Sequence, residues 1–266
     1  RLGSRVTLLE AAPRLLGRDH PDAAAIVHAR LAREGLDVRT GIAIESVERG
    51  DDGVRAVLAD GAELVADEIL VAAGRAPRTA DLGLDAVGVA RSERGHVVVD
   101  ARLRTTARGI YAAGDVTGGP AFTHVAGYHG GLVVQNALLG LRRRAVYAAV
   151  PAVTYTDPEV ASVGPAASTV AGARVARLEH TASDRAIAEG DTDGFTELVG
   201  DRRGRLVGAT VVGPVAGETI AALAAHVAAG TRLGRIAGTV HAYPTRSDAI
   251  QRAALDDLRR SLARHR

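Results

Sequence analysis

Residues 106–116 read TARGIYAAGDV, and this stretch indicates the fold class of the chain. An apolar run that ends in Gly-Asp is typical of a strand in an open α/β sheet, where ligands bind at the carboxyl ends of the strands. Gly114 lets the backbone come close to a ligand, and the carboxylate of Asp115 can accept hydrogen bonds from sugar hydroxyls. The stretch therefore predicts a nucleotide-binding fold with a ligand at its Gly-Asp pair.

The residues that follow predict a helix from about Phe122 to Leu139, with Gly140 at its end. The N-terminus of a helix carries free N–H groups and the positive end of the helix dipole. A helix that begins beside the Gly-Asp pair is suited to stabilise negative charge on a reduced flavin.

The start of the chain contains a second nucleotide-binding pattern. Residues 5–9 form a β-branched and leucine run that ends on Glu10, and a helical pattern follows at about residues 19–34. An acid at the end of a parallel strand can accept hydrogen bonds from a ribose diol and repels the 2′-phosphate of NADP, so Glu10 favours NADH. A solvated acid would give the same pattern, and the nearby Arg14 leaves NADPH open.

Short strands are expected between these two regions. A short strand is expected at residues 36–40, and three alternating segments predict further strands at 44–48, 54–58 and 63–66, with hairpin turns at 50–53 and 60–61. Residues 69–73 form an uninterrupted apolar run, which predicts a strand buried on both faces. Two more strands are expected at residues 97–99 and 109–112.

Beyond Pro151 the pattern changes to an antiparallel sheet with helices. The expected strands lie near residues 152–155, 173–178, 194–199 and 205–212. The expected helices are residues 217–229 and a last one from Ser247 onward.

The composition excludes several classes of function. All 33 basic residues are arginine and 31 residues are acidic, so the net charge is only +2 and no nucleic-acid-binding face is expected. The one dense basic run, residues 142–144, is interpreted as a solvated loop. The absence of cysteine excludes disulfides, thiolate metal sites and a redox thiol pair in this chain. No apolar run is long enough for a membrane span, so we expect a cytoplasmic protein without a membrane partner or a metal site.

Four blocks of the sequence, in this order, resemble the pyridine nucleotide-disulfide oxidoreductases, a family that includes dihydrolipoamide dehydrogenase and mercuric reductase. The blocks are AAGRAP at residues 72–77, GIYAAGDV at 109–116, PAVTYTDPEVASVG at 151–164 and HAYPTRSD at 241–248. The second block is similar to the family's second FAD-binding motif, and the third to the opening of its dimerisation domain. The resemblance covers nearly the whole chain.

The resemblance implies a fold of mixed class, α/β and α+β, in which partial Rossmann-like NAD and FAD domains precede an antiparallel-sheet-plus-helices dimerisation domain. We assign residues 1–73 to the NAD(P)-binding domain, 74–149 to the FAD-binding domain and 150–266 to the dimerisation domain, through which a homodimer is expected. The family's first glycine-rich motif and redox cysteines would lie upstream of Arg1, so a truncated chain is expected. Residues 1–145 should then be poorly stable alone, whereas the dimerisation domain should fold.

The resemblance also implies which residues hold the two cofactors. Asp115, with Gly114, would bond the ribityl chain of FAD. The helix start would lie along the flavin through Ala121, Phe122, Thr123 and His124, with His124 acting mainly through its backbone. The residues implied for NAD are Glu10 at the adenosine ribose, Ala43 beside the adenine and Gly74 against the nicotinamide half.

The C-terminal block departs from the family pattern at two candidate catalytic residues. Thiol-handling members have a histidine directly before Pro-Thr and a glutamate that orients it, whereas this chain has Tyr243 and Asp248. A phenol with a pKa near 10 is a poor base at neutral pH. Asp248 also fits a capping box in which Thr245 caps the last helix, and His241 lies two residues before the tyrosine.

The function expected from these residues is that of an FAD-dependent NAD(P)H oxidoreductase. Hydride would pass from the nicotinamide to the flavin, and electrons would pass on to a disulfide, a metal ion or another small-molecule acceptor. Two alternatives stay open. In the first alternative the chain is a non-catalytic dimerisation module, in line with its lack of cysteine. In the second it belongs to a flavin NADH oxidase or peroxide reductase without thiol chemistry, which suits Tyr243.

Overall fold

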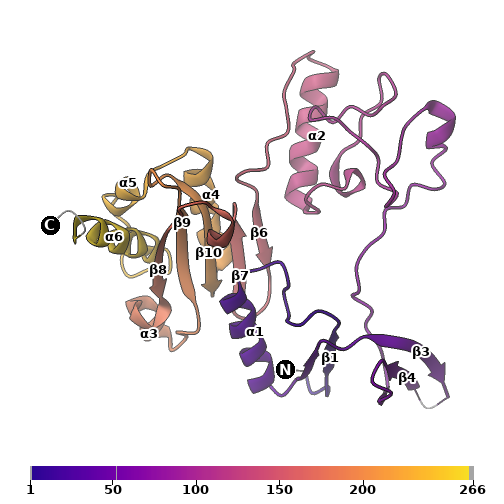
Figure 1. Ribbon diagram of the computed structural model, residues 1–266, viewed down its shortest axis with the longest axis horizontal. Coiled ribbons are helices and arrows are strands. Elements are labelled where there is room, and N and C mark those ends of the chain that lie inside the picture. The colour runs from indigo at the N-terminus through magenta and orange to yellow at the C-terminus, as the bar shows by residue number, and fades with distance from the viewer. Residues whose placement is uncertain (1, 52, 264–266) are drawn as a thin grey trace. The chain divides into compact units, whose positions relative to one another are not determined.

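The computed structural model describes residues 2–51 and 53–263, which form two compact units (Figure 1). Unit 1 comprises the described residues up to Leu70 together with those from Ala148 onward, and unit 2 comprises Val71–Tyr147. The two units are compact bodies and do not correspond to the three expected domains, whose boundaries at residues 73 and 149 stay a prediction. The fold class is confirmed as mixed α/β with an antiparallel sheet.

A five-stranded antiparallel sheet is the centre of unit 1, with strand order β6-β7-β10-β9-β8. Its strands are β6 (Pro151–Thr154), β7 (Glu159–Val163), β8 (Arg174–Glu179), β9 (Phe195–Gly200) and β10 (Leu206–Gly213). The sequence predicted all of these except β7, whose five residues follow a turn and are too few for a clear alternation. Strand β9 is buried along its whole length, because helices cover both faces of the sheet.

Three helices cover one face of this sheet (Figure 1). They are α4 (Ala216–Ala228), α5 (Leu233–Ala237) and α6 (Asp248–Ala263). Alternate strand residues point toward these helices, since neighbouring side chains on a strand face opposite sides. The core between them includes Val163, Leu198, Val211, Ile220, Leu223, Ile236 and Ile250.

Helix α1 (Pro21–Arg33) covers the opposite face of the same sheet. Its residues Ala23 and Val27 are buried against Val160, Phe195 and Val212. Val212 follows directly after a residue that faces α4–α6, so the two helical layers lie on opposite sides of the strands. The dimerisation part of the chain therefore packs with a helix from the chain's start in one core.

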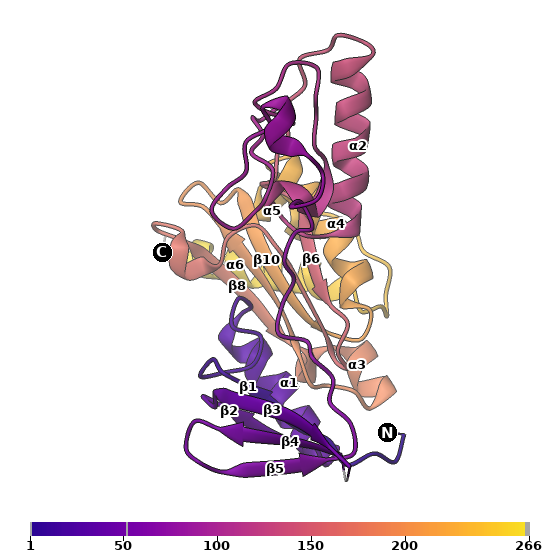
Figure 2. The same cartoon turned by 90° about the vertical axis from the view of Figure 1, so that its right-hand side faces the viewer.

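Two smaller sheets complete unit 1, and Figure 2 shows their strands close together. Strands β1 (Thr7–Glu10) and β2 (Asp37–Thr40) pair in parallel, and β3 (Ile44–Gly50), β4 (Gly53–Leu58) and β5 (Glu63–Ala66) form an antiparallel meander. The expected hairpin turns join these strands, although Asp52 lies outside the described residues.

The strand expected at residues 69–73 does not form, and that prediction is wrong. Leu70 is 90% exposed and Val71 is 76% exposed, so the apolar run is not buried on either face. A strand forms only where a neighbour supplies hydrogen-bonding partners, and no described strand pairs with this segment.

Unit 2 has little regular structure apart from α2 (Thr123–Ala137), which confirms the predicted helix to within two residues at each end. Two short 3₁₀ turns, η1 (Leu84–Val87) and η2 (Gly114–Thr117), precede it. The strands expected at residues 97–99 and 109–112 are wrong, because each segment makes only a single bridge with another loop of the unit.

Short helices in unit 1 escaped the sequence analysis because they contain too few residues for a helical period. They are α3 (Asp184–Glu189), α5, η3 (Ala167–Thr169) and η4 (His180–Ala182). Of the helices that the structure describes, none is long and apolar enough to cross a membrane.

Candidate functional site

The predicted Gly-Asp pair forms the tight turn η2, here called the Gly-Asp turn (residues 114–117). Gly114 is buried and has φ +78°, a conformation that favours glycine. A Cβ at this position would lie 3.1 Å from the Cβ of Ala126 in α2, so the helix leaves little room for a side chain here. Asp115 follows with an exposed carboxylate, as a residue that binds sugar hydroxyls must have.

Both backbone polar groups of Gly114 have partners. Its N–H donates to Nδ1 of His129 in α2 at 3.0 Å, and its carbonyl accepts from the hydroxyl of Thr117 at 2.8 Å. The other ring nitrogen of His129 lies 2.9 Å from the hydroxyl of Tyr147. His129 is fully buried, and burial lowers its pKa. The sequence analysis missed this histidine, because nothing in its spacing connects it to Gly114.

The start of α2 presents the predicted residues at the surface. Ala121, Thr123 and His124 are exposed, and the half-buried ring of Phe122 stacks on the ring of His124 at 5.1 Å. Within unit 2, the side chain of Phe122 gives no cap to the helix that it precedes. The start of α2 and the carboxylate of Asp115 thus belong to one unit and suit a ligand with hydroxyl groups and a ring that takes up negative charge, such as a flavin nucleotide.

Glu10 lies at the carboxyl end of β1, where the sequence predicts a ribose. Its Oε1 accepts the backbone N–H of Ala12 at 2.8 Å, which orients the half-buried carboxylate. The loop after β2 is hydrogen-bonded to the segment that carries Glu10: the N–H of Ile42 donates to the carbonyl of Glu10, and that of Gly41 donates to the carbonyl of Ala12. The exposed Ala43 comes next, so the structure brings Glu10 and Ala43 to one edge of the parallel pair.

Arg14 follows Glu10 closely but its guanidinium is held by its own loop. Its nitrogens donate to the carbonyls of Leu16 at 2.8 Å, Gly17 at 2.8 Å and Asp19 at 3.0 Å. A guanidinium in this arrangement has few donors left for a phosphate.

The third residue predicted for NAD, Gly74, belongs to unit 2. Its backbone is exposed and has φ +124°, which is open only to glycine at ordinary strain. No Cβ at this position would meet a described atom within 4 Å, so the space beside this backbone is open.

Tyr243 is 68% exposed, and its hydroxyl donates to Oδ2 of Asp184 in α3 at 2.7 Å. The hydrogen bond to this carboxylate raises the pKa of the phenol above its ordinary value. The side chain is therefore a hydrogen-bond donor and an even poorer base than an unpaired tyrosine. Asp184 lies 59 residues before Tyr243, and the sequence analysis missed it.

Asp248 is buried at the start of α6, with 3% exposure, and burial raises the pKa of its carboxyl group. Its backbone N–H donates to the hydroxyl of Thr245 at 3.2 Å, so one half of the predicted capping box forms. Among the described residues, neither carboxyl oxygen of Asp248 has a hydrogen-bond partner, so the acid does not reach back. Nδ1 of the partly buried His241 is likewise unpartnered in this part of the chain.

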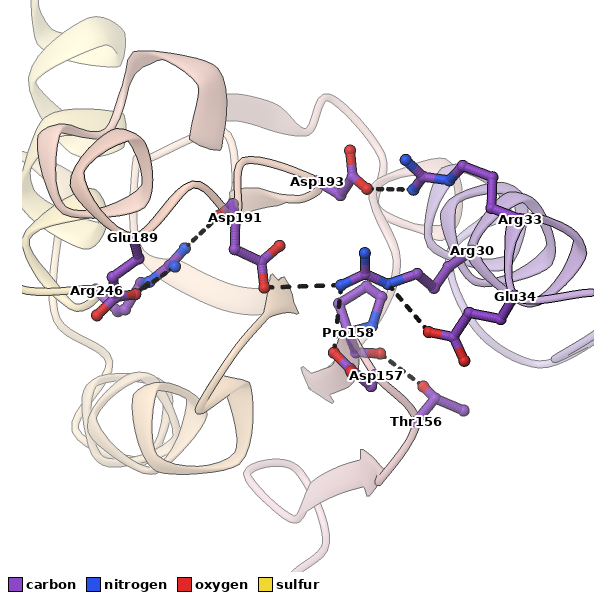
Figure 3. Close-up of polar contacts among 10 residues, drawn as sticks. All are labelled: Arg30, Arg33, Glu34, Thr156, Asp157, Pro158, Glu189, Asp191, Asp193 and Arg246. Atoms are coloured by element: carbon purple, nitrogen blue, oxygen red, sulfur yellow. Dashed lines mark hydrogen bonds and ion pairs between the residues drawn. The ribbon is translucent and has the colours of Figure 1, made fainter. Parts of the chain in front are cut away.

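The C-terminal block is tied to α3 and to α1 through Arg246 (Figure 3). Arg246 donates two hydrogen bonds to Oε2 of Glu189, at 2.8 and 2.5 Å, and one to the carbonyl of Asp191 at 2.9 Å. The carboxylate of Asp191 lies 3.8 Å from a guanidinium nitrogen of Arg30 in α1. Helix α3 therefore holds the block at two points, Tyr243 and Arg246.

Two family models match the chain. The model described as pyridine nucleotide-disulphide oxidoreductase matches residues 1–130. The model for the dimerisation domain of the same family matches residues 150–254.

Curated relatives with similar sequences include two kinds of reductase. A mercuric reductase from Streptomyces lividans is 41% identical over 262 residues, which cover 96% of this chain and 55% of that protein. A dihydrolipoyl dehydrogenase from Thermus scotoductus is 39% identical over 265 residues, covering 96% of this chain and 57% of the relative. The chain thus spans little more than half the length of these relatives.

The chain is also similar in structure to solved proteins. LpdA from Mycobacterium tuberculosis is similar with a TM-score of 0.89 and 32% identity, over 96% of this chain and 56% of that one. The flavoprotein disulfide reductase RclA from Escherichia coli, solved as a Cu(II) complex, has a TM-score of 0.87 and 31% identity, over 95% of this chain and 58% of that one.

Proposed function

This chain belongs to the pyridine nucleotide-disulphide oxidoreductase family, and we propose that it supplies FAD- and NAD(P)H-binding residues to an oxidoreductase and acts as a homodimer. Members of this family are oxidoreductase flavoenzymes. The observation that carries the proposal is the Gly-Asp turn, in which buried Gly114 places an exposed Asp115 in the same unit as the start of α2. A dimerisation module alone has no use for this turn.

In the proposed site, Asp115 accepts hydrogen bonds from hydroxyls of the ribityl chain of FAD, and the segment Ala121–His124 lies along the ring. The positive end of the α2 dipole stabilises negative charge on the reduced ring. When bound there, FAD would supply the chemistry of a two-electron acceptor for hydride from NAD(P)H. His124 acts through its backbone.

NADH is the favoured reductant in this proposal. Glu10 offers a carboxylate, already oriented by Ala12, to the ribose diol, and a carboxylate repels a 2′-phosphate. Arg14 does not offset that repulsion well, because its nitrogens already donate to three carbonyls. Ala43 lies at the same edge for the adenine, and Gly74 is proposed for the nicotinamide half.

The acceptor is proposed to be a disulfide or another small molecule. Tyr243, whose only phenol hydrogen is donated to Asp184, argues against an acceptor that needs a base at this position. The hydrogen bond between Tyr243 and Asp184 also supports a second candidate function, that of a flavin NADH oxidase or peroxide reductase without thiol chemistry. Asp248 is proposed mainly as part of the α6 start, since its N–H bonds Thr245. The cytoplasmic location expected from the sequence stays part of the proposal.

The proposal is tested by incubating the purified chain with FAD, desalting it and recording its visible absorption spectrum. Retained flavin absorbance that bleaches with NADH, and less readily with NADPH, is the expected result. A colourless protein that still sediments as a dimer would contradict the cofactor part of the proposal and favour the non-catalytic dimerisation module. Asp115→Ala serves as the matched variant, because it removes the carboxylate but leaves Gly114 and α2 in place.

A further inference from the structure

We propose that His129 is the positioning residue of the Gly-Asp turn: its neutral ring accepts the backbone N–H of Gly114 and so fixes the Ala113–Gly114 peptide, from which the turn leads directly to Asp115 and its carboxylate. The inference rests on the proposed function, because it concerns how this chain presents Asp115 to FAD. The contact joins two residues 15 positions apart, both buried, at 3.0 Å.

The direction of the hydrogen bond determines the protonation state of the ring. Gly114 N–H can only donate, so Nδ1 of His129 must be the acceptor and carries no hydrogen. The single ring hydrogen of the neutral form is then on Nε2, which donates to the hydroxyl of Tyr147 at 2.9 Å. A protonated ring would set an N–H against the N–H of Gly114, which disrupts the turn. Burial opposes that protonation, since it lowers the pKa of His129.

The backbone of the turn is held on both sides of Gly114, so it cannot shift to bring another acceptor to the Gly114 N–H. The Gly114 carbonyl is already bonded to the Thr117 hydroxyl at 2.8 Å, so both peptide planes that meet at Gly114 are held. Ala126 of α2 lies so close that a Cβ on Gly114 would approach its Cβ to 3.1 Å. Ala126 and His129 are three residues apart and so share one face of α2, which faces the turn. One residue of this face restricts the turn sterically and the other holds it by a hydrogen bond.

Loss of the histidine acceptor would leave a buried N–H without a partner, which destabilises the turn. The turn would then sample other conformations, in which the Asp115 carboxylate is not presented to the ribityl hydroxyls. His129 does not touch the cofactor in this inference, so the expected change is in binding and not in the chemistry of transfer.

The test uses this chain with His129→Phe, which keeps an aromatic ring but removes the acceptor, and with His129→Asn, whose side-chain oxygen can take the place of Nδ1. His129→Phe is expected to raise the FAD dissociation constant by roughly tenfold and to accelerate amide hydrogen exchange at Gly114 by a similar factor. His129→Asn should stay within about threefold of the parent in both measurements. His226→Phe, a histidine in α4 of unit 1 that contacts Thr231, is the control and should change neither.

NMR of the chain labelled with ¹⁵N in its histidines tests the inference without a substitution. The His129 ring should show an unprotonated Nδ1 and a protonated Nε2, and the opposite tautomer would overturn the inference. It is overturned equally if His129→Phe leaves the FAD dissociation constant unchanged, whether or not Gly114 exchange accelerates, because the contact would then serve the fold alone. A parent chain that binds no FAD contradicts the proposed function, whereas the ring tautomer and Gly114 exchange still decide whether His129 holds the turn.

Discussion

At the scale of single residues, Tyr243 shows how a neighbour decides the chemistry of a side chain. The phenol is exposed, yet its hydroxyl donates to Asp184 at 2.7 Å, and this carboxylate favours the protonated form. Asp184→Asn should therefore lower the pKa of Tyr243 toward the ordinary value of about 10. Tyrosinate absorbance during an alkaline titration measures this, because the chain has only five tyrosines.

Tyr243→Phe is the control for that titration, since it removes this phenol and leaves the other four, among them Tyr147, whose pKa is also raised by burial. An identical titration of the parent and of Asp184→Asn would show that the contact does not hold the phenol in solution.

A second residue, His180, makes the stability of unit 1 depend on pH. It is 3% exposed, with Nε2 bonded to the Thr196 hydroxyl at 3.1 Å, and burial together with nearby Arg246 lowers its pKa to about 4. The unfolded chain binds a proton at about pH 6.5, so the stability from neutral His180 is complete above that pH and is lost as the pH falls toward 4. The loss should be on the order of 3 kcal/mol.

Urea unfolding of the parent and of His180→Asn, which does not titrate, measures this effect between about pH 7 and 4. The free energy of unfolding of the parent should fall more steeply with acid than that of the variant. Equal slopes would mean that His180 is not the group responsible.

At the scale of elements, the contact between α1 and the sheet depends on apolar packing more than on its ion pairs. Val27 is buried at 1% exposure against Phe195 and its apolar neighbours, whereas the side chain of Arg33, paired with Asp193, is 58% exposed. Val27→Ala should lower the free energy of unfolding of unit 1 by about 2 kcal/mol. Arg33→Ala, its matched control at the end of the same helix, should lower it by less than about 1 kcal/mol.

Denaturant unfolding followed by circular dichroism compares these two variants under identical conditions. If the arginine variant loses as much stability as the valine variant, the ion pairs of Figure 3 would stabilise the position of α1 at least as strongly as the core does, which contradicts this prediction.

At the scale of the whole molecule, the dimerisation part does not complete its own core. Helix α1 covers Val160, Phe195 and Val212, and Arg177, which stacks on Phe195 at 3.7 Å, also bonds Asp22 of α1. A fragment of residues 150–266 would expose this face. We expect it to dimerise, as the sequence predicts, but to unfold about 10 °C below the same sheet in the whole chain.

Thermal unfolding with sedimentation measures both properties of the fragment. A fragment as stable as the whole chain would show that α1 adds nothing to the sheet. A fragment that stays monomeric would contradict the predicted interface.

Local patterns were enough to predict the helices α1, α2, α4 and α6, because each has several turns of apolar period. Local patterns failed where a strand depends on a neighbour. Residues 69–73 have the composition of a buried strand but stay exposed, since no described strand pairs with them. Periodicity records which face a segment would bury and contains no information about what covers it.

The sequence by itself determined the family, through four blocks in order, and the position of the Gly-Asp pair within it. It also indicated that Gly114 lets the backbone come close to a ligand, whereas the positive φ of that glycine is known only from the structure. Only the tertiary structure decided that His129 holds that glycine, that Asp184 holds Tyr243, and that α1 closes the sheet. The reason is physical: these contacts join residues between 15 and about 190 positions apart, and a hydrogen bond or an apolar contact depends on distance in space, which sequence spacing does not contain.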